Sequence, residues 1–76
     1  MSLSMTEKLQ LQSVQSVSGL IKFCERMGWY GAVSFNPEAR YENQRYRGQL
    51  GGAILTRKDK QELIDALVKK ALEIHS

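Results

Sequence analysis

Residues 56–74 read TRKDKQELIDALVKKALEI, and this stretch decides the fold more than any other. Its apolar side chains recur at spacings of one, three and four, and they are Leu63, Ile64, Leu67, Val68, Ala71 and Leu72. That period gathers them into one stripe along an α-helix. The Thr56 hydroxyl can accept a backbone hydrogen bond where this helix starts, and the Asp59 carboxylate suits the positive end of the helix dipole. We therefore predict a helix over 57–74 whose stripe packs against another element.

A second amphipathic helix is predicted over residues 16–27. Its apolar residues fall on one face, and they are Val17, Leu20, Ile21, Cys24 and Met27. Ser13, Ser16 and Ser18 supply hydroxyl caps near its start. Gly28 is a natural stop signal, because glycine can adopt the left-handed conformation that ends many helices.

The segment ahead of residue 16 allows two interpretations. Leu9 and Leu11 alternate with glutamines, which is the period of a strand, and we favour a short strand at 8–14. Alternatively, Ser4 and Glu7 have the spacing of a capping box, which would start one long first helix instead.

Between the two helices the sequence follows the period of strands. Residues 30–35 alternate and end in the turn residues Asn36-Pro37, so we predict a strand there. A further strand is predicted at 45–50 and 52–55, with Gly51-Gly52 as a bulge or close backbone approach within it.

The predicted order of elements is strand, helix, strand, strand, helix. It describes a small two-layer α+β domain of the β-α-β-β-α type, in which an antiparallel sheet carries both helices on one face. The alternative with a long first helix has the order α-β-β-α. A chain of 76 residues forms one domain, for which we expect a stability of about 4–11 kcal/mol and little room for a deep pocket. The internal Met5 suggests that residues 1–4 are a leader, which leaves residues 5–76 as that domain.

The candidate reactive residues argue against an enzyme, and we expect no catalytic residue, cofactor or metal. Cys24 is the only thiol and lies on the apolar side of its helix. The only histidine, His75, is the penultimate residue, where we expect it to fray. One cysteine and one distant histidine cannot form a closed metal site. Residues 48–52 lack the spacing of a phosphate-binding loop.

The sequence also bears on where the protein acts. No apolar run approaches the length needed to cross a membrane, and the N-terminal residues have no apolar core typical of a secretion signal. A single cysteine excludes an internal disulfide and fits a reducing compartment. We therefore expect a cytoplasmic protein without a membrane partner.

Residues 40–60 carry the positive charge of the chain. They hold six basic and two acidic side chains, a net charge of +4, whereas the whole chain carries +3. Arginine forks match the geometry of phosphate, and tyrosine rings stack on bases. We therefore predict nucleic acid as the partner of a basic β-hairpin, with Arg45 and Arg47 on one face and Tyr46 on the other. The predicted contacts are Arg40, Tyr41, Arg45, Tyr46, Arg47, Arg57 and Lys58.

Two alternatives stay open. The arginines could instead form a solvated sheet edge whose charge discourages association between sheets. The protein could also be a protein-interaction regulator or a homodimer with no nucleic-acid contact, which would need an exposed apolar strip. Trp29, Tyr30 and Leu50 are the predicted members of that strip, although Trp29 could instead seal one end of the core.

The chain holds GAVSF at 31–35 and TRKDKQELI at 56–64. These two stretches resemble the second strand and the start of the final helix of the DinI-like family, which comprises small bacterial and phage proteins. The resemblance implies the fold β-α-β-β-α and a role in modulating the RecA recombination filament. The acidic ridge of that family's final helix has no counterpart here, because four lysines are interspersed among the carboxylates of residues 58–73. The resemblance therefore assigns no filament contact to a particular residue.

Overall fold

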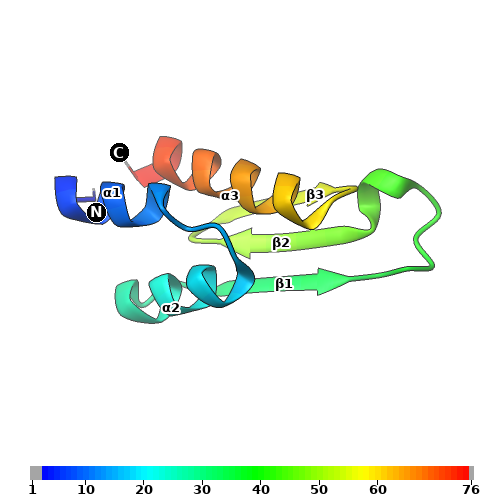
Figure 1. Cartoon of the computed structure of the whole chain (residues 1–76), viewed down its shortest axis with the longest axis horizontal. Coiled ribbons are helices and arrows are strands. Elements are labelled where there is room, and N and C mark those ends of the chain that lie inside the picture. Colours follow the sequence, from blue (N-terminus) through cyan, green and yellow to red (C-terminus); the bar gives the residue numbers. More distant parts are fainter. Residues whose placement is uncertain (1–2, 76) are drawn as a thin grey trace.

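The computed structural model describes residues 3–75 as three helices and one three-stranded sheet. The elements, in chain order, are α1 (Met5–Gln12), α2 (Val17–Met27), β1 (Gly31–Phe35), the 3₁₀ turn η1 (Glu42–Gln44), β2 (Tyr46–Leu50), β3 (Ala53–Arg57) and α3 (Lys60–His75) (Figure 1). The strands pair antiparallel in the order β1-β2-β3. The predicted class, a small α+β domain with an antiparallel sheet, is confirmed. The predicted β-α-β-β-α order is not, because the chain begins with two helices.

The first element, α1, is a helix, so the predicted strand at 8–14 is wrong. A complete capping box starts this helix: Ser4 Oγ accepts a hydrogen bond from the Glu7 amide at 3.2 Å, and Glu7 Oε1 accepts one from the Ser4 amide at 2.8 Å. Residues two apart on a helix lie about 200° apart around its axis. Leu11 is therefore buried while Leu9 is 59% exposed, and the alternation that indicated a strand fits this helix equally well.

The alternative of one long first helix is only partly right, because the chain breaks between α1 and α2. The Ser13 hydroxyl donates to the Gln10 carbonyl at 2.7 Å where α1 ends. A new cap follows, in which Ser16 Oγ accepts a hydrogen bond from the Gly19 amide at 3.1 Å. The helix α2 then ends at Gly28, whose φ of 70° is left-handed. The predicted second helix is confirmed.

Gly51 and Gly52 form the two-residue turn of a β-hairpin rather than the predicted bulge. Both have positive φ, 55° and 97°, as the turns that match the twist of paired strands require. Leu50 pairs with Ala53 across this turn. The single strand predicted across 45–55 is therefore two strands, β2 and β3.

The last helix, α3, starts at Lys60, three residues later than predicted. Thr56 and Arg57 still pair with β2 as the end of β3, so Thr56 is not a helix cap. Asp59 has that role instead, because its Oδ1 accepts a hydrogen bond from the Gln61 amide at 3.0 Å. The hydrogen-bonded pairing of β3 with β2 therefore prevails over the capping signal at Thr56, and the helix starts later.

The helices α2 and α3 cover the same face of the sheet, as predicted. A side chain at Gly31 or at Gly48 would lie on that face. Gly48 pairs with Val33, which is two residues after Gly31 and therefore on the same side of the strand. A Cβ atom at Gly48 would lie 2.5 Å from Leu67 Cδ1 of α3, and one at Gly31 would overlap Cys24 Sγ of α2. The helices therefore pack on the strand backbone itself. The largest fully buried side chains of the core are Leu11, Leu20, Cys24, Leu50, Leu63, Ile64 and Leu67.

The molecule is 39 Å along its longest axis, and its two ends differ. The helix α1 and both chain ends gather at one end, whereas residues 36–45 extend the opposite end (Figure 1). The C-terminal end of β3 and the start of α3 also lie at that second end (Figure 1). Since Tyr46 pairs with Arg57, the two halves of the basic segment meet there.

An aromatic cluster closes the end of the molecule that holds the termini. The Trp29 ring stacks on His75 with centroids 4.3 Å apart and meets Phe23 edge-on at 5.4 Å. His75 Nε2 lies 2.6 Å from the Gly51 carbonyl oxygen, and because a carbonyl only accepts, Nε2 carries the hydrogen. The expected fraying of His75 is therefore wrong. Trp29 seals one end of the core.

Candidate nucleic-acid interface

The face of the sheet opposite α2 and α3 is the candidate binding surface, and we call it the open face. Its strand residues follow from the register, and they are Ala32, Ser34, Arg47, Gln49, Ile54 and Thr56. None of the three strands contains an aspartate or a glutamate. The charge of this face therefore comes from arginine alone.

A shallow recess of about 420 Å³ lies at the basic end of the open face. It is lined only by polar side chains, which are Ser34, Asn36, Gln44, Arg45, Arg47 and Thr56. We call it the arginine recess. Ser34, Arg47 and Thr56 enter it from the three strands, because they are paired across the sheet.

Arg45 reaches the same recess from the turn η1. The Asn36 amide donates to the Arg45 carbonyl at 2.7 Å, and the Arg45 amide donates to the Glu42 carbonyl at 3.1 Å. These bonds hold the end of η1 against the end of β1. The prediction that Arg45 and Arg47 share one face, opposite Tyr46, is confirmed.

The two guanidinium groups of the arginine recess are available to a ligand. Both side chains are exposed, and neither forms an ion pair with another residue of 3–75. Glu38 and Glu42 lie in the adjoining loop but do not line the recess. The recess therefore combines two positive charges with hydroxyl and amide groups.

The other predicted contacts are distributed around this end of the molecule. Arg40 lies over the ring of Tyr41, 5.7 Å from its centroid, in the exposed loop before η1. Arg57 shares the covered side with Tyr46, donates to the Thr56 carbonyl at 2.7 Å and lines a groove beside α3. Lys58 is exposed in the link between β3 and α3.

The structure does not bring Tyr46 into the arginine recess. Its ring lies 4.6 Å from that of Phe35, centroid to centroid, on the covered side. It is half-buried against the core. The strand alternation that puts Arg47 on the open face also turns Tyr46 away from any ligand bound there.

The predicted apolar strip of Trp29, Tyr30 and Leu50 does not exist as one surface. Leu50 is fully buried, and Trp29 packs in the aromatic cluster. Tyr30, in contrast, is 69% exposed and lines a recess on the open face. Leu50 thus belongs to the core, Trp29 to its rim and Tyr30 to the surface.

The residues considered for catalysis have structural roles. Cys24 is a free thiol buried among core side chains, and burial raises the pKa of that thiol. A protonated, inaccessible thiol is a poor nucleophile. Within residues 3–75 no three histidine, cysteine or carboxylate side chains are grouped so that they could hold a metal ion. No helix in that range is long and apolar enough to cross a membrane.

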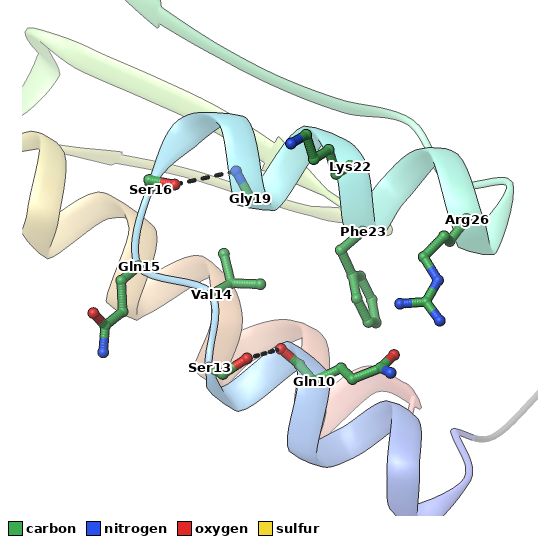
Figure 2. A pocket seen from close by; sticks show the side chains of 9 residues that line it. All are labelled: Gln10, Ser13, Val14, Gln15, Ser16, Gly19, Lys22, Phe23 and Arg26. Carbon is green, nitrogen blue, oxygen red and sulfur yellow. Dashed lines mark hydrogen bonds between the residues drawn. The ribbon is translucent and has the colours of Figure 1, made fainter.

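A second groove, of about 360 Å³, lies between α1 and α2 (Figure 2). Arg26 points from α2 toward α1 across it (Figure 2). Its serine hydroxyls are already bonded, Ser13 to a carbonyl of α1 and Ser16 to the Gly19 amide. These polar groups serve the helix ends, so we favour the arginine recess as the site.

Sequence reasoning missed the neutral members of the arginine recess. Ser34 and Thr56 could have been found from register, because a two-residue turn at Gly51-Gly52 places Thr56 beside Arg47. Asn36 and Gln44 are brought in by the fold of the loop between β1 and β2, for which the sequence carries no clear signal. Comparison of the chain with protein-family models, curated proteins and solved structures found no match.

Proposed function

We propose that this protein is a small, non-enzymatic module that binds the phosphate backbone of nucleic acid through the arginine recess. The observation that carries the proposal is the composition of that recess, two unpaired guanidinium groups among hydroxyl and amide groups with no carboxylate in its lining. A guanidinium presents paired N–H donors that match two phosphate oxygens. Hydroxyl and amide side chains commonly complete such contacts to phosphate and sugar.

The surrounding charge supports the same proposal. The loop of residues 36–45 and the link between β3 and α3 lie at the same end of the molecule (Figure 1), so their basic residues Arg40 and Lys58, with Arg57 at the end of β3, extend the positive field beyond the recess. Such a field speeds the encounter with a polyanion and contributes affinity that falls with salt. A cytoplasmic location is part of the proposal and is supported by the single free thiol.

A salt titration of binding tests the proposal. Fluorescence anisotropy would follow a labelled oligonucleotide of about ten nucleotides, with the protein and an Arg45→Ala/Arg47→Ala variant. Removing two phosphate contacts should weaken binding and reduce the slope of log K against log salt by about 1.4 for a single strand or about 1.8 for a duplex.

The matched control is Lys69→Ala/Lys70→Ala, which removes the same charge from the outer side of α3. These lysines are exposed and lie outside the arginine recess. The control should lose less affinity than the arginine variant. Equal losses in both variants, or no binding by the unaltered protein at low salt, would refute the recess as the site.

A protein-interaction regulator, DinI-like or homodimeric, is the second candidate. One observation favours it: Met5 and Leu9, one turn apart on α1, are 73% and 59% exposed. Sedimentation velocity would show a dimer that Met5→Ser/Leu9→Ser dissociates. A monomer that still binds oligonucleotides would leave the first candidate standing alone.

A further inference from the structure

We propose that the ligand of the open face is a single-stranded nucleic acid, with a phosphate in the arginine recess and an adjacent base stacked on Tyr30. This inference rests on the proposed function and narrows it to one class of ligand. It also assigns a binding role to Tyr30.

The two positions belong to one continuous surface. Beside the arginine recess lies a second recess of about 250 Å³, which Tyr30 lines at its far side. Ser34 and Arg47 line both recesses, so the two recesses adjoin. A strand that leaves the arginines can follow this surface toward Tyr30.

The span between the two positions suits a short stretch of nucleic acid. Tyr30 precedes Ser34 by four residues in an extended segment, which corresponds to roughly 13 Å at the rise of a strand. The surface between them is low, because Ala32 is the side chain that intervenes on β1. Gln49, paired with Ala32, offers an amide that can donate to or accept from the edge of a base.

Tyr30 is suited to stacking on a base, whereas Trp29 and Tyr46 are not. Its side chain is 69% exposed, and within residues 3–75 it forms no ring contact or hydrogen bond through that side chain. Trp29 and Tyr46 are held in aromatic pairs on the covered side or at the rim. The Tyr30 backbone is fixed, since its carbonyl accepts a hydrogen bond from the Gly51 amide at 3.3 Å.

Stacking on Tyr30 distinguishes an unpaired strand from a duplex. The faces of duplex bases are covered by their neighbours, so a duplex offers only phosphate to the arginine recess and none of its base faces to Tyr30. The open face is also positively charged without an acidic residue in its strands. Its chemistry therefore complements a polyanion with accessible bases.

The test compares single-stranded and duplex oligonucleotides of equal length by fluorescence anisotropy. The proteins are the unaltered chain, Tyr30→Ala, Tyr30→Phe and Arg45→Ala/Arg47→Ala. Tyr30→Ala should weaken single-strand binding by about 5- to 150-fold, the effect of losing one stacked base, and should leave duplex binding unchanged. Tyr30→Phe keeps the ring and should keep single-strand binding.

The variants separate the two proposals. If Tyr30→Ala leaves single-strand binding unchanged, or lowers duplex binding equally, while the arginine variant still weakens binding, the inference about single strands is wrong and the proposed function stands. If the arginine variant binds as well as the unaltered chain, the proposed function is wrong too. Circular dichroism of each variant confirms its fold. If Tyr30→Ala unfolds, the unaltered chain still decides the inference, because equal affinity for single-stranded and duplex oligonucleotides would contradict it.

Discussion

The two faces of this sheet are built from neighbouring residues of the same strands and have opposite properties. The covered face holds apolar or small residues along most of its length, which are Gly31, Val33, Gly48, Leu50, Ala53 and Leu55, and it holds Phe35, Tyr46 and Arg57 at its basic end. The open face holds mainly polar residues, and they are Ser34, Arg47, Gln49 and Thr56 beside Ala32 and Ile54. The comparison teaches that, in a chain of 76 residues, one alternating pattern places the residues that pack against the helices on one face and the proposed binding residues on the other. Substitutions on the two faces should therefore have different consequences.

The largest loss of stability is expected from Leu67→Ala. Leu67 is fully buried on α3 and faces the backbone of β2. The cavity should lower the free energy of unfolding by about 2–5 kcal/mol, measured by urea denaturation. Thr56→Ala, on the open face, is the control and should change it by less than about 0.5 kcal/mol. Similar losses in both variants would break the distinction between the faces.

A sharper comparison uses two adjacent residues of β2. Gly48→Ala places a methyl group 2.5 Å from Leu67 Cδ1, and overpacking of this kind costs about 1–3 kcal/mol. Gln49→Ala, on the open face, should cost less than about 0.5 kcal/mol. Thermal unfolding followed by circular dichroism would measure both, and a Gly48→Ala protein as stable as the Gln49→Ala protein would show that the side chains of Leu63 and Leu67 can make room for the methyl group.

A smaller effect, dependent on pH, is expected from the thiol beneath the covered face. Burial raises the pKa of Cys24 above its ordinary value of 9.0. Below that value the thiol is protonated in both states and contributes no pH dependence. Above it the unfolded chain loses the proton first, so the free energy of unfolding falls as the pH rises toward the folded-state pKa.

Urea denaturation at a series of pH values from neutral to alkaline would test this expectation. The control is Cys24→Ala, which keeps every other titrating group. Its stability should decline less at alkaline pH than that of the unaltered protein. Parallel declines would mean that the thiol is as accessible in the folded protein as in the unfolded chain.

The smallest effect is expected from Ile54→Thr on the open face. Ile54 is 51% exposed although it is one of the bulkiest residues of the sheet, and threonine keeps its branching at Cβ. The free energy of unfolding should change by no more than about 0.5 kcal/mol. A larger loss, seen in the same urea assay, would indicate that the open face is covered in solution by a second molecule.

The sequence predicted the elements that carry a strong period and missed those that depend on distant pairing. The stripe from Leu63 to Leu72 and the apolar face of α2 were sufficient to predict both helices and the layer they form. The predicted start of α3 was wrong because Thr56 can cap a helix but can also pair with Arg47 in β2. In the folded protein Thr56 pairs with Arg47, so the helix begins later. The two leucines of α1 fitted either a strand or a helix, and only the capping box at Ser4 separated these.

The candidate site was predictable in part for the same reason. Arg45 and Arg47 were correctly placed together from alternation alone. Tyr46 was placed opposite to them, so its assignment to a stacking role conflicted with the predicted geometry. Tyr30 lies on the face of Ala32 and Ser34 because side chains alternate along β1, a pattern already visible in residues 30–35.

The first and last described residues of this protein lie side by side, so the backbone almost closes on itself. The Leu3 amide donates to the His75 carbonyl at 2.9 Å, and the loop of residues 36–45 lies at the far end of the long axis (Figure 1). Joining residue 75 to residue 3 through a short glycine-rich linker and opening the chain within 36–45 would preserve all three strands and the aromatic cluster. The permuted chain would contain the same helices and strands in a different sequence order, and its new ends would lie beside the arginine recess.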